Sequence, residues 1–149
     1  MLKELELVVL SSDRLHASTV AIDGRAVLIE GPSGAGKSDL ALRLIDRGAV
    51  LVSDDQTLVV RAGKVLHARA PAEIAGRMEV RGIGIVVMPH VADVPVGLIV
   101  RLDGQVERMP DRRIRRVAGV EVAQMHVDAF HASAPIKVEM MLRGVELVA

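Results

Sequence analysis

Residues 26–48, AVLIEGPSGAGKSDLALRLIDRG, carry the strongest structural signal in the sequence. Residues 31–38 match the phosphate-binding pattern G-x-x-x-x-G-K-[ST] at every fixed position. An apolar run precedes the pattern, and apolar side chains at positions 40, 41, 44 and 45 follow it with the spacing of an amphipathic helix. The stretch therefore predicts a strand over 26–30, a phosphate loop, and a helix over 37–47 that Gly48 ends.

The residue types of this loop suit the phosphates of a nucleotide. Glycines let main-chain N–H groups turn toward phosphate oxygens, and the helix N-terminus adds its dipole. Lys37 would reach the terminal phosphates, and the Ser38 hydroxyl would ligate Mg²⁺. The alternative is a glycine-rich turn that only caps a helix, but such a turn does not require Lys-Ser after its last glycine. We expect the nucleotide to contact Gly31, Ser33, Gly34, Ala35, Gly36, Lys37, Ser38 and Asp39.

A phosphoryl-transfer site also needs an acidic group that holds the metal or orients the nucleophile. Asp54 and Asp55 end the apolar run 49–53, directly after the predicted helix. Two adjacent acids at a strand end can divide metal binding and proton transfer between them. An Asx turn would also account for the pair. Asp103 is the other candidate, although Asp103-Gly104 is also a common turn dipeptide.

The remaining sequence predicts a mixed sheet rather than a purely parallel one. Asp23-Gly24 and Ala62-Gly63 each separate two apolar runs and are typical of hairpins. The expected class is α/β, with one domain over 1–149. We expect strands at 5–10, 18–22, 26–30, 49–53, 57–61, 64–68, 83–88, 96–102, 105–109 and 113–117, helices at 37–47 and 135–147, and a short helix after Pro71 within 70–78.

Composition excludes several classes of function. The 19 basic residues balance the 19 acidic ones, and Phe130 is the only aromatic residue, so a nucleic-acid partner is not expected. A bound adenine would have to lie between aliphatic or arginine side chains. The chain has no cysteine, no secretory signal and no apolar run long enough to cross a bilayer, which favours the cytoplasm and no membrane partner. Arginines cluster over 108–116, where they could dock a partner or form a solvated edge.

The segment from His16 to Ile85 resembles the catalytic domain of the bifunctional HPr kinase/phosphorylases. The resemblance rests on His16, GPSGAGKS at 31–38, DLALRLIDRG at 39–48, LVSDD at 51–55, Ala70-Pro71 and MEVRGIGI at 78–85. Members of this family phosphorylate a serine of HPr, the small phosphocarrier of the sugar phosphotransferase system. The resemblance implies a P-loop domain of the phosphoenolpyruvate carboxykinase-like type, in which helices flank a mixed, curved sheet.

The resemblance also implies roles for single residues. Asp54 would be the base toward the serine hydroxyl, and the acid in a reverse reaction in which inorganic phosphate attacks phosphoserine. His16 would lie near Asp54 and Asp55, and Arg81 near the reacting phosphates. Ser38 and Glu79 would ligate Mg²⁺. ATP, Mg²⁺, an HPr-like partner and a homo-oligomer are the implied cofactors and partners.

Other interpretations remain open for these positions and for the chain. His16 could be a surface or core histidine, and Glu79 with Arg81 a solvent-facing strand pair. Only about fifteen residues precede His16, and no Pro-Gly-Arg occurs in the C-terminal part, so we expect a short form of the family that holds the catalytic C-terminal domain. The alternative functions are a small-molecule P-loop kinase or NTPase, and a nucleotide-sensing module without turnover.

Overall fold

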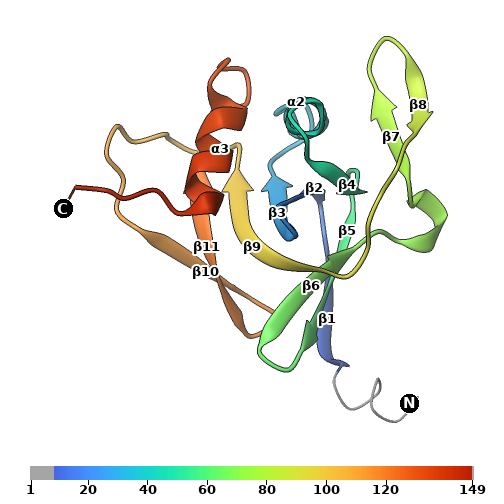
Figure 1. Cartoon of the computed structure of the whole chain (residues 1–149), viewed down its shortest axis with the longest axis horizontal. Coiled ribbons are helices and arrows are strands. Elements are labelled where there is room, and N and C mark those ends of the chain that lie inside the picture. The colour runs from blue at the N-terminus through green and yellow to red at the C-terminus, as the bar shows by residue number, and fades with distance from the viewer. Residues whose placement is uncertain (1–8, 149) are drawn as a thin grey trace.

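A computed structural model describes residues 9–148 of the chain. Its centre is a sheet of nine strands, and a separate two-stranded sheet projects from it (Figure 1). The elements run in the order β1 (Val9–Leu15), β2 (Ala17–Ile22), β3 (Arg25–Glu30), α2 (Lys37–Asp46), β4 (Val50–Ser53), β5 (Thr57–Ala62), β6 (Val65–Arg69), η1 (Ala72–Ile74), β7 (Arg77–Val80), β8 (Gly84–Val87), β9 (Val94–Arg101), β10 (Arg113–Val117), β11 (Val120–His126) and α3 (Ala134–Arg143).

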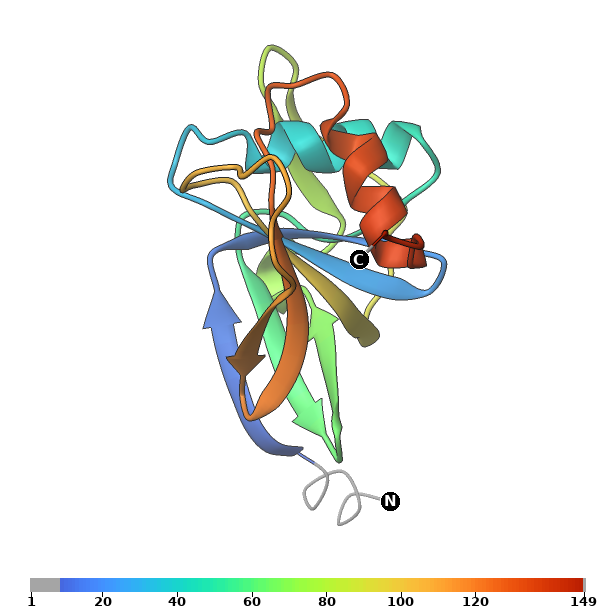
Figure 2. The ribbon, with the colours of Figure 1, turned by 90° about the vertical axis from the view of Figure 1, so that its left-hand side faces the viewer.

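Strand β9 joins the two halves of the large sheet. Its first residues, Val94 and Pro95, pair with β6, and from Val96 onward it pairs with β3 and then also with β11. One half is β1-β5-β6, and the other has the order β10-β11-β9-β3-β2-β4. Because β9 changes partners along its length, the sheet curves between the halves (Figure 2).

Four strands of the larger half point in the same direction. β3 and β11 both run parallel to β9, and β2 is antiparallel to both β3 and β4. The carboxyl ends of β4, β3, β9 and β11 therefore meet at one edge of the sheet. Ligands of open α/β sheets bind outside this edge.

The core lies on both faces of the central strands. Val27 and Ile29 of β3 belong to a cluster that includes buried side chains of α2 and α3, whereas Ala26 and Leu28 belong to a second cluster against the β1-β5-β6 half. This alternation follows from the period-2 geometry of a strand. Figure 2 shows both helices on one side of the sheet. The almost uninterrupted apolar sequence of β3 reflects burial on both faces.

Most of the predicted elements are confirmed. The turn at Asp23-Gly24 joins β2 to β3, and the turn at Ala62-Gly63 joins β5 to β6. The helix expected after the phosphate-loop pattern is α2, and it ends at Asp46, one residue earlier than predicted. The sheet is mixed, as the hairpins indicated.

The structure corrects the predictions between residues 70 and 126. The short helix expected after Pro71 is the 3₁₀ helix η1, which ends at Ile74 because the chain turns at Gly76 (φ +74°) and enters strand β7. No strand forms over 105–109. That stretch belongs to an exposed connection from β9 to β10 in which Pro110 cannot donate a hydrogen bond. Strand β11, which pairs with β9 and β10, was not predicted.

The two ends of the chain also differ from the prediction. The expected strand 5–10 falls largely outside the described residues, and β1 continues through polar residues to Leu15, paired with β5. Helix α3 ends at Arg143 rather than 147, because Gly144 takes a left-handed conformation (φ +77°). Among the described residues, no helix is long and apolar enough to cross a membrane.

Leu28 tests how much the second cluster contributes to stability. It is fully buried in the middle of β3, on the face turned away from α2 and α3. We expect Leu28→Ala to lower the free energy of unfolding by about 2–5 kcal/mol, because it removes apolar contacts and leaves a cavity. The measurement is urea unfolding. Val65→Ala, at a side chain that is 43% exposed, is the control and should change the stability by less than about 0.5 kcal/mol. Equal losses in the two variants would contradict this view of the core.

Candidate active site

The predicted phosphate loop leaves β3 at Gly31 and enters α2 at Lys37. Gly34 and Gly36 have φ values of +84° and +96°, a region that side chains with a Cβ rarely adopt. The Ala35 N–H donates to the Pro32 carbonyl at 3.1 Å, which closes the turn. The loop therefore opens directly onto the N-terminus of α2, where free N–H groups and the helix dipole favour an anion.

Both ends of the loop pack against segments that follow other strands of the same edge. A Cβ on Gly31 would lie 3.0 Å from the Cβ of Leu102, which follows β9. A Cβ on Gly36 would lie 3.0 Å from the Cβ of Ala129, which follows β11. Both glycines thus allow a close approach, and Gly36 in addition takes a left-handed conformation.

Lys37 folds back over the loop. Its Nζ donates to the Gly31 carbonyl at 2.8 Å and to the Pro32 carbonyl at 3.3 Å. These carbonyls hold the ammonium group at the loop, beside the position that the sequence pattern assigns to the phosphates. Asp39, in the first turn of α2, pairs with Arg43 one turn later at 3.0 Å.

Asp54 is the centre of a network of polar contacts. Its Oδ1 accepts hydrogen bonds from the hydroxyls of Ser38 (2.6 Å) and Ser18 (2.9 Å), and its Oδ2 accepts one from the main-chain N–H of Glu79 (3.1 Å). The side chain is almost fully buried. Donors from β2, α2 and β7 therefore fix the orientation of this carboxylate, next to the first turn of the phosphate-loop helix.

Asp55 turns away from Asp54. It takes a left-handed conformation (φ +69°), and its side chain is exposed. Its N–H donates to the Ser18 hydroxyl at 3.1 Å, and the N–H of Gln56 donates to the Asp54 carbonyl at 2.8 Å. This turn separates the two acids, so that one carboxylate lies inside the site and the other faces solvent.

Ser38 and Asp54 together fit a magnesium ion. Their oxygen atoms already approach within hydrogen-bond distance at the mouth of the phosphate loop. Mg²⁺ prefers oxygen ligands and is usually held by one or two carboxylates together with phosphate oxygens and water. Among residues 9–148, no group of three or more His, Asp or Glu side chains is arranged to hold a metal without such a substrate.

The other residues implied by the resemblance contact the site in different ways. Glu79 reaches Asp54 through its main-chain N–H, while its side chain is exposed on β7. Arg81 is exposed in the turn between β7 and β8. His16 is exposed in the bend between β1 and β2, and no hydrogen bond joins it to Asp54 or Asp55 in the described part of the chain. The structure thus brings Ser38, Asp54 and the main chain of Glu79 together through hydrogen bonds. The role of His16 beside the two acids stays a prediction.

Ser18 is a site residue that the sequence analysis missed. Its hydroxyl is fully buried and bridges the Asp54 carboxylate and the Asp55 N–H. The available signal was a serine inside the apolar run of β2, since a buried hydroxyl requires a partner. The identity of that partner depends on the pairing of β2 with β4, which residue spacing does not show.

Asp103, the alternative acid, belongs to an ion pair instead. The Arg101 guanidinium donates to both of its carboxylate oxygens, at 2.9 and 2.6 Å, and these hydrogen bonds lower the pKa of Asp103. Arg101 also contacts Glu30, the buried last residue of β3, which binds Arg115 of β10 as well. The arginine cluster is therefore only partly a free surface, because Arg115 neutralises a buried acid.

Comparisons with known proteins show which family the chain is similar to. A family model described as "HPr Serine kinase C-terminal domain" matches residues 8–93. Two similar curated proteins, each called HPr kinase/phosphorylase, come from Clostridium acetobutylicum (45% identity over 76 residues, 51% of this chain and 25% of the relative) and Mycoplasmopsis pulmonis (41% over 73 residues, 49% and 24%). The chain thus matches about a quarter of the length of these relatives.

A solved structure extends the likeness beyond this segment. The HPr(Ser) kinase/phosphatase from Coxiella burnetii superimposes with a TM-score of 0.75 at 28% identity, over 88% of this chain and 94% of that one. The fold is accordingly the phosphoenolpyruvate carboxykinase-like type of P-loop α/β domain, as the resemblance implied.

Substitutions of two loop glycines would separate backbone strain from close packing. Gly34 and Gly36 both have positive φ, but a Cβ on Gly34 meets no atom within 4 Å, whereas one on Gly36 meets Ala129 and the Phe130 ring. We expect Gly34→Ala to cost about 1–2 kcal/mol of unfolding free energy through the left-handed conformation alone. Gly36→Ala should cost more and should also reduce the rise in melting temperature that ATP produces.

Urea unfolding and thermal melting with and without ATP measure these effects. If the two variants behave alike, the contact between the loop and residues 129–130 does not constrain the loop.

Proposed function

The chain belongs to the HPr serine kinase C-terminal domain family, and we propose that it is an ATP-dependent kinase that phosphorylates a serine of HPr or of a similar phosphocarrier protein. The observation that carries the proposal is the position of the buried Asp54 carboxylate. It lies within 2.6 Å of the Ser38 hydroxyl, in the first turn after the phosphate loop. An acid held at this point is beside the terminal phosphate of a nucleotide bound in the loop.

The proposed reaction uses these groups in distinct roles. The acceptor serine oxygen attacks the γ-phosphorus, its proton passes to the Asp54 carboxylate, and the bond to the leaving ADP oxygen breaks. Lys37 and the N–H groups of the loop stabilise the negative charge of the phosphoryl group. In a reverse, phosphorylase direction, protonated Asp54 would return the proton to serine while inorganic phosphate takes the phosphoryl group as pyrophosphate.

Mg²⁺ is the expected cofactor. The Ser38 hydroxyl would ligate it, and the carboxylate of Asp54 or of Glu79 would complete the protein ligands. When bound, the ion would neutralise charge on the β- and γ-phosphates. The hydrogen bond from the Glu79 main chain to Asp54 supports a position of Glu79 beside the ion.

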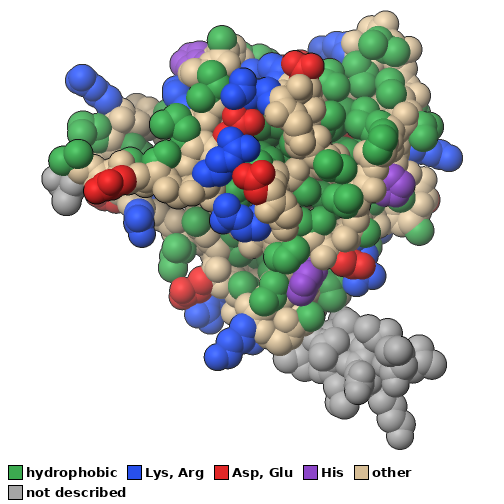
Figure 3. Space-filling model, viewed as in Figure 1, with side chains coloured by type: hydrophobic (Ala, Val, Ile, Leu, Met, Phe, Trp, Pro, Cys, Tyr) green, Lys and Arg blue, Asp and Glu red, His purple; other side chains and the backbone are tan. Residues whose placement is uncertain are grey.

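A projecting hairpin favours a protein acceptor over a small metabolite. The hairpin of β7 and β8 is joined to the site through the Glu79–Asp54 hydrogen bond. Its turn exposes Ile83 by 78%, and its strand β8 exposes Ile85 and Val87 by 70% and 77%. Figure 3 shows apolar side chains gathered over this end of the molecule. Side chains two residues apart share one face of a strand. Such an apolar strip suits a protein surface around the phosphorylated serine.

The oligomeric state and the location belong to the same proposal. Relatives named as HPr kinase/phosphorylases support a cytoplasmic role in regulating the phosphotransferase system, and an assembly of several copies is expected from the resemblance. Size-exclusion chromatography with light scattering would measure the number of copies.

Asp54→Asn tests the proposed base. Asparagine keeps a hydrogen-bond acceptor for the two serines but cannot take up the proton. We expect phosphate transfer to HPr of the same organism, followed by intact mass, to fall by about 10²–10⁴-fold. ATP should still raise the melting temperature, because the phosphate loop is unchanged.

The control is Asp46→Asn, at an exposed aspartate at the end of α2, which should transfer phosphate at the normal rate. Transfer that persists in Asp54→Asn would contradict the assigned role. A wild-type protein that binds ATP but modifies no HPr would instead favour the nucleotide sensor or another acceptor.

Ile85→Asp tests the hairpin as the docking surface. The side chain is exposed, so the fold should tolerate the charge, but a protein that packs against the strip would lose an apolar contact. We expect the KM for HPr to rise by about tenfold, equivalent to about 1.4 kcal/mol, with little change in ATP binding. Val65→Asp, on an exposed side chain of β6, is the matched control and should leave the KM unchanged. An unchanged KM in Ile85→Asp would place the acceptor elsewhere.

A further inference from the structure

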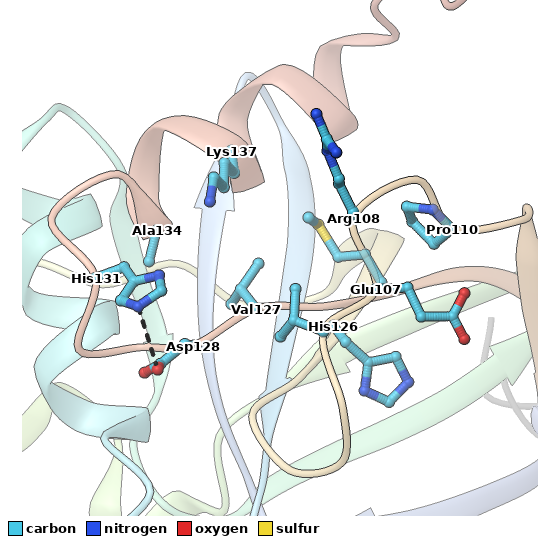
Figure 4. Close-up of a pocket in the computed structure, with 11 residues that line it drawn as sticks. Glu107, Arg108, Pro110, His126, Val127, Asp128, His131, Ala134 and Lys137 are labelled. Atoms are coloured by element: carbon cyan, nitrogen blue, oxygen red, sulfur yellow. Dashed lines mark ion pairs between the residues drawn. The ribbon is translucent and has the colours of Figure 1, made fainter.

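A cavity of about 210 Å³ lies at the ends of β9 and β11, strands on the other side of β3 from β4 and Asp54. Figure 4 shows the residues that line it. Its walls come from the end of β11, the first turn of α3 and the connection between β9 and β10. In Figure 4, Lys137 and Ala134 of α3 lie above Val127, and Arg108 lies at the side of the opening. The lining of the cavity includes Val106, Arg108, Met125, Val127, Ala134 and Lys137.

Two chain segments that contribute to the cavity wall also contact the phosphate loop. Asp128 and His131 line the cavity at one side, and between them Ala129 packs within 3.0 Å of the Cβ position of Gly36. Arg43 of α2 donates to the carbonyls of Ala129 and His131, which fixes the segment against the helix that follows the loop.

On the other side, Leu102 packs on Gly31 and leads into the connection that carries Arg108. The two segments that contribute to the cavity wall therefore contact the phosphate loop at its two ends, Gly31 and Gly36.

Strand order sets the direction of a bound nucleotide. Along the sheet the order is β11-β9-β3-β2-β4, and the loop follows β3 (Figure 1). Asp54 follows β4, on one side of the loop, whereas the cavity lies at the ends of β9 and β11, on the other side. If the terminal phosphate faces Asp54, the nucleoside must extend away from it, toward the cavity.

The size and lining of the cavity suit a flat ring. Its volume is below the range of about 300–1,000 Å³ typical of pockets for whole drug-sized ligands, so it would hold the base rather than a complete nucleotide. Met125, Val127 and Ala134 give it apolar walls. Arg108 and Lys137 add two cations at its rim, and a guanidinium plane can stack on a nucleobase. Phe130, the only aromatic side chain, does not line the cavity.

We propose that this cavity binds the nucleoside of the nucleoside triphosphate whose phosphates occupy the loop, with the base packed on Val127 and Ala134 and covered by Arg108. The inference rests on the proposed function, since it assigns a position to the same phosphoryl donor. It adds a specificity site to the chain, because a loop that reads only phosphates would not distinguish a nucleotide from an inorganic polyphosphate.

The test compares two ligands of equal phosphate length, MgATP and magnesium tripolyphosphate, by calorimetry. Wild-type protein should bind ATP at least about tenfold more tightly than tripolyphosphate. Ala134→Leu fills the floor of the cavity and should weaken ATP binding by about tenfold, with tripolyphosphate affinity unchanged within about twofold. Arg108→Ala, at an exposed residue, should show the same selective loss if Ala134→Leu does not fold. Arg112→Ala, on the same connection but outside the lining, should bind both ligands normally.

The outcomes separate the two proposals. If wild-type protein binds ATP no more tightly than tripolyphosphate, or if the folded cavity variants lose neither ligand or both equally, the nucleoside does not occupy this cavity, and the proposed kinase function is unaffected. If wild-type protein binds neither ligand, the proposed function fails and the inference fails with it.

Discussion

The carboxylate of Asp54 connects the elements on which the candidate site depends. It follows β4, and it accepts hydrogen bonds from Ser18 of β2, from Ser38 of α2 and from the main chain of Glu79 in β7. A buried carboxylate is costly unless donors satisfy it, so these contacts favour one arrangement of the four elements. The same contacts orient the oxygen atoms toward the phosphate loop. The stability of the site and the proposed chemistry therefore both involve this one group.

The direction of the strands accounts for the rest of the site. Because β4, β3, β9 and β11 run the same way, the acid, the phosphate loop and the cavity all lie at one edge of the sheet. Their order along that edge follows the strand order. Along this edge the acid comes first, then the loop proposed for the phosphates, and then the cavity proposed for the nucleoside. A protein acceptor would then approach from the side of the β7–β8 hairpin, next to Asp54.

A second set of charges supports the edge without taking part in the proposed chemistry. Glu30 is buried at the end of β3, directly before the loop, and Arg101 and Arg115 neutralise it. These residues come from β3, β9 and β10, so the ion pairs hold the β10–β11 hairpin against the strand that carries the loop. Loss of one partner would leave an uncompensated charge in the interior, which is why this network is structural.

The local sequence determined the elements with strong short-range signals. The phosphate loop, α2 and the two tight hairpins follow from residue pattern alone, because glycine conformations and helical periodicity act over a few residues. The strand predicted at 105–109 and the missed strand β11 show the limit, since a strand exists only where a neighbour offers an edge for hydrogen bonds.

For the site, the residue pattern alone predicted the phosphate loop, and it indicated Asp54 and Asp55 as the acids beside it. Only the tertiary structure decided that Asp54 rather than Asp55 points inward, that Ser18 holds it, and that His16 makes no hydrogen bond to either aspartate among the described residues. It also placed Ala129, which follows β11, against Gly36 at the end of the phosphate loop. The physical reason is that these contacts join strands far apart in the chain, so they depend on strand order and direction, which local residue spacing does not encode.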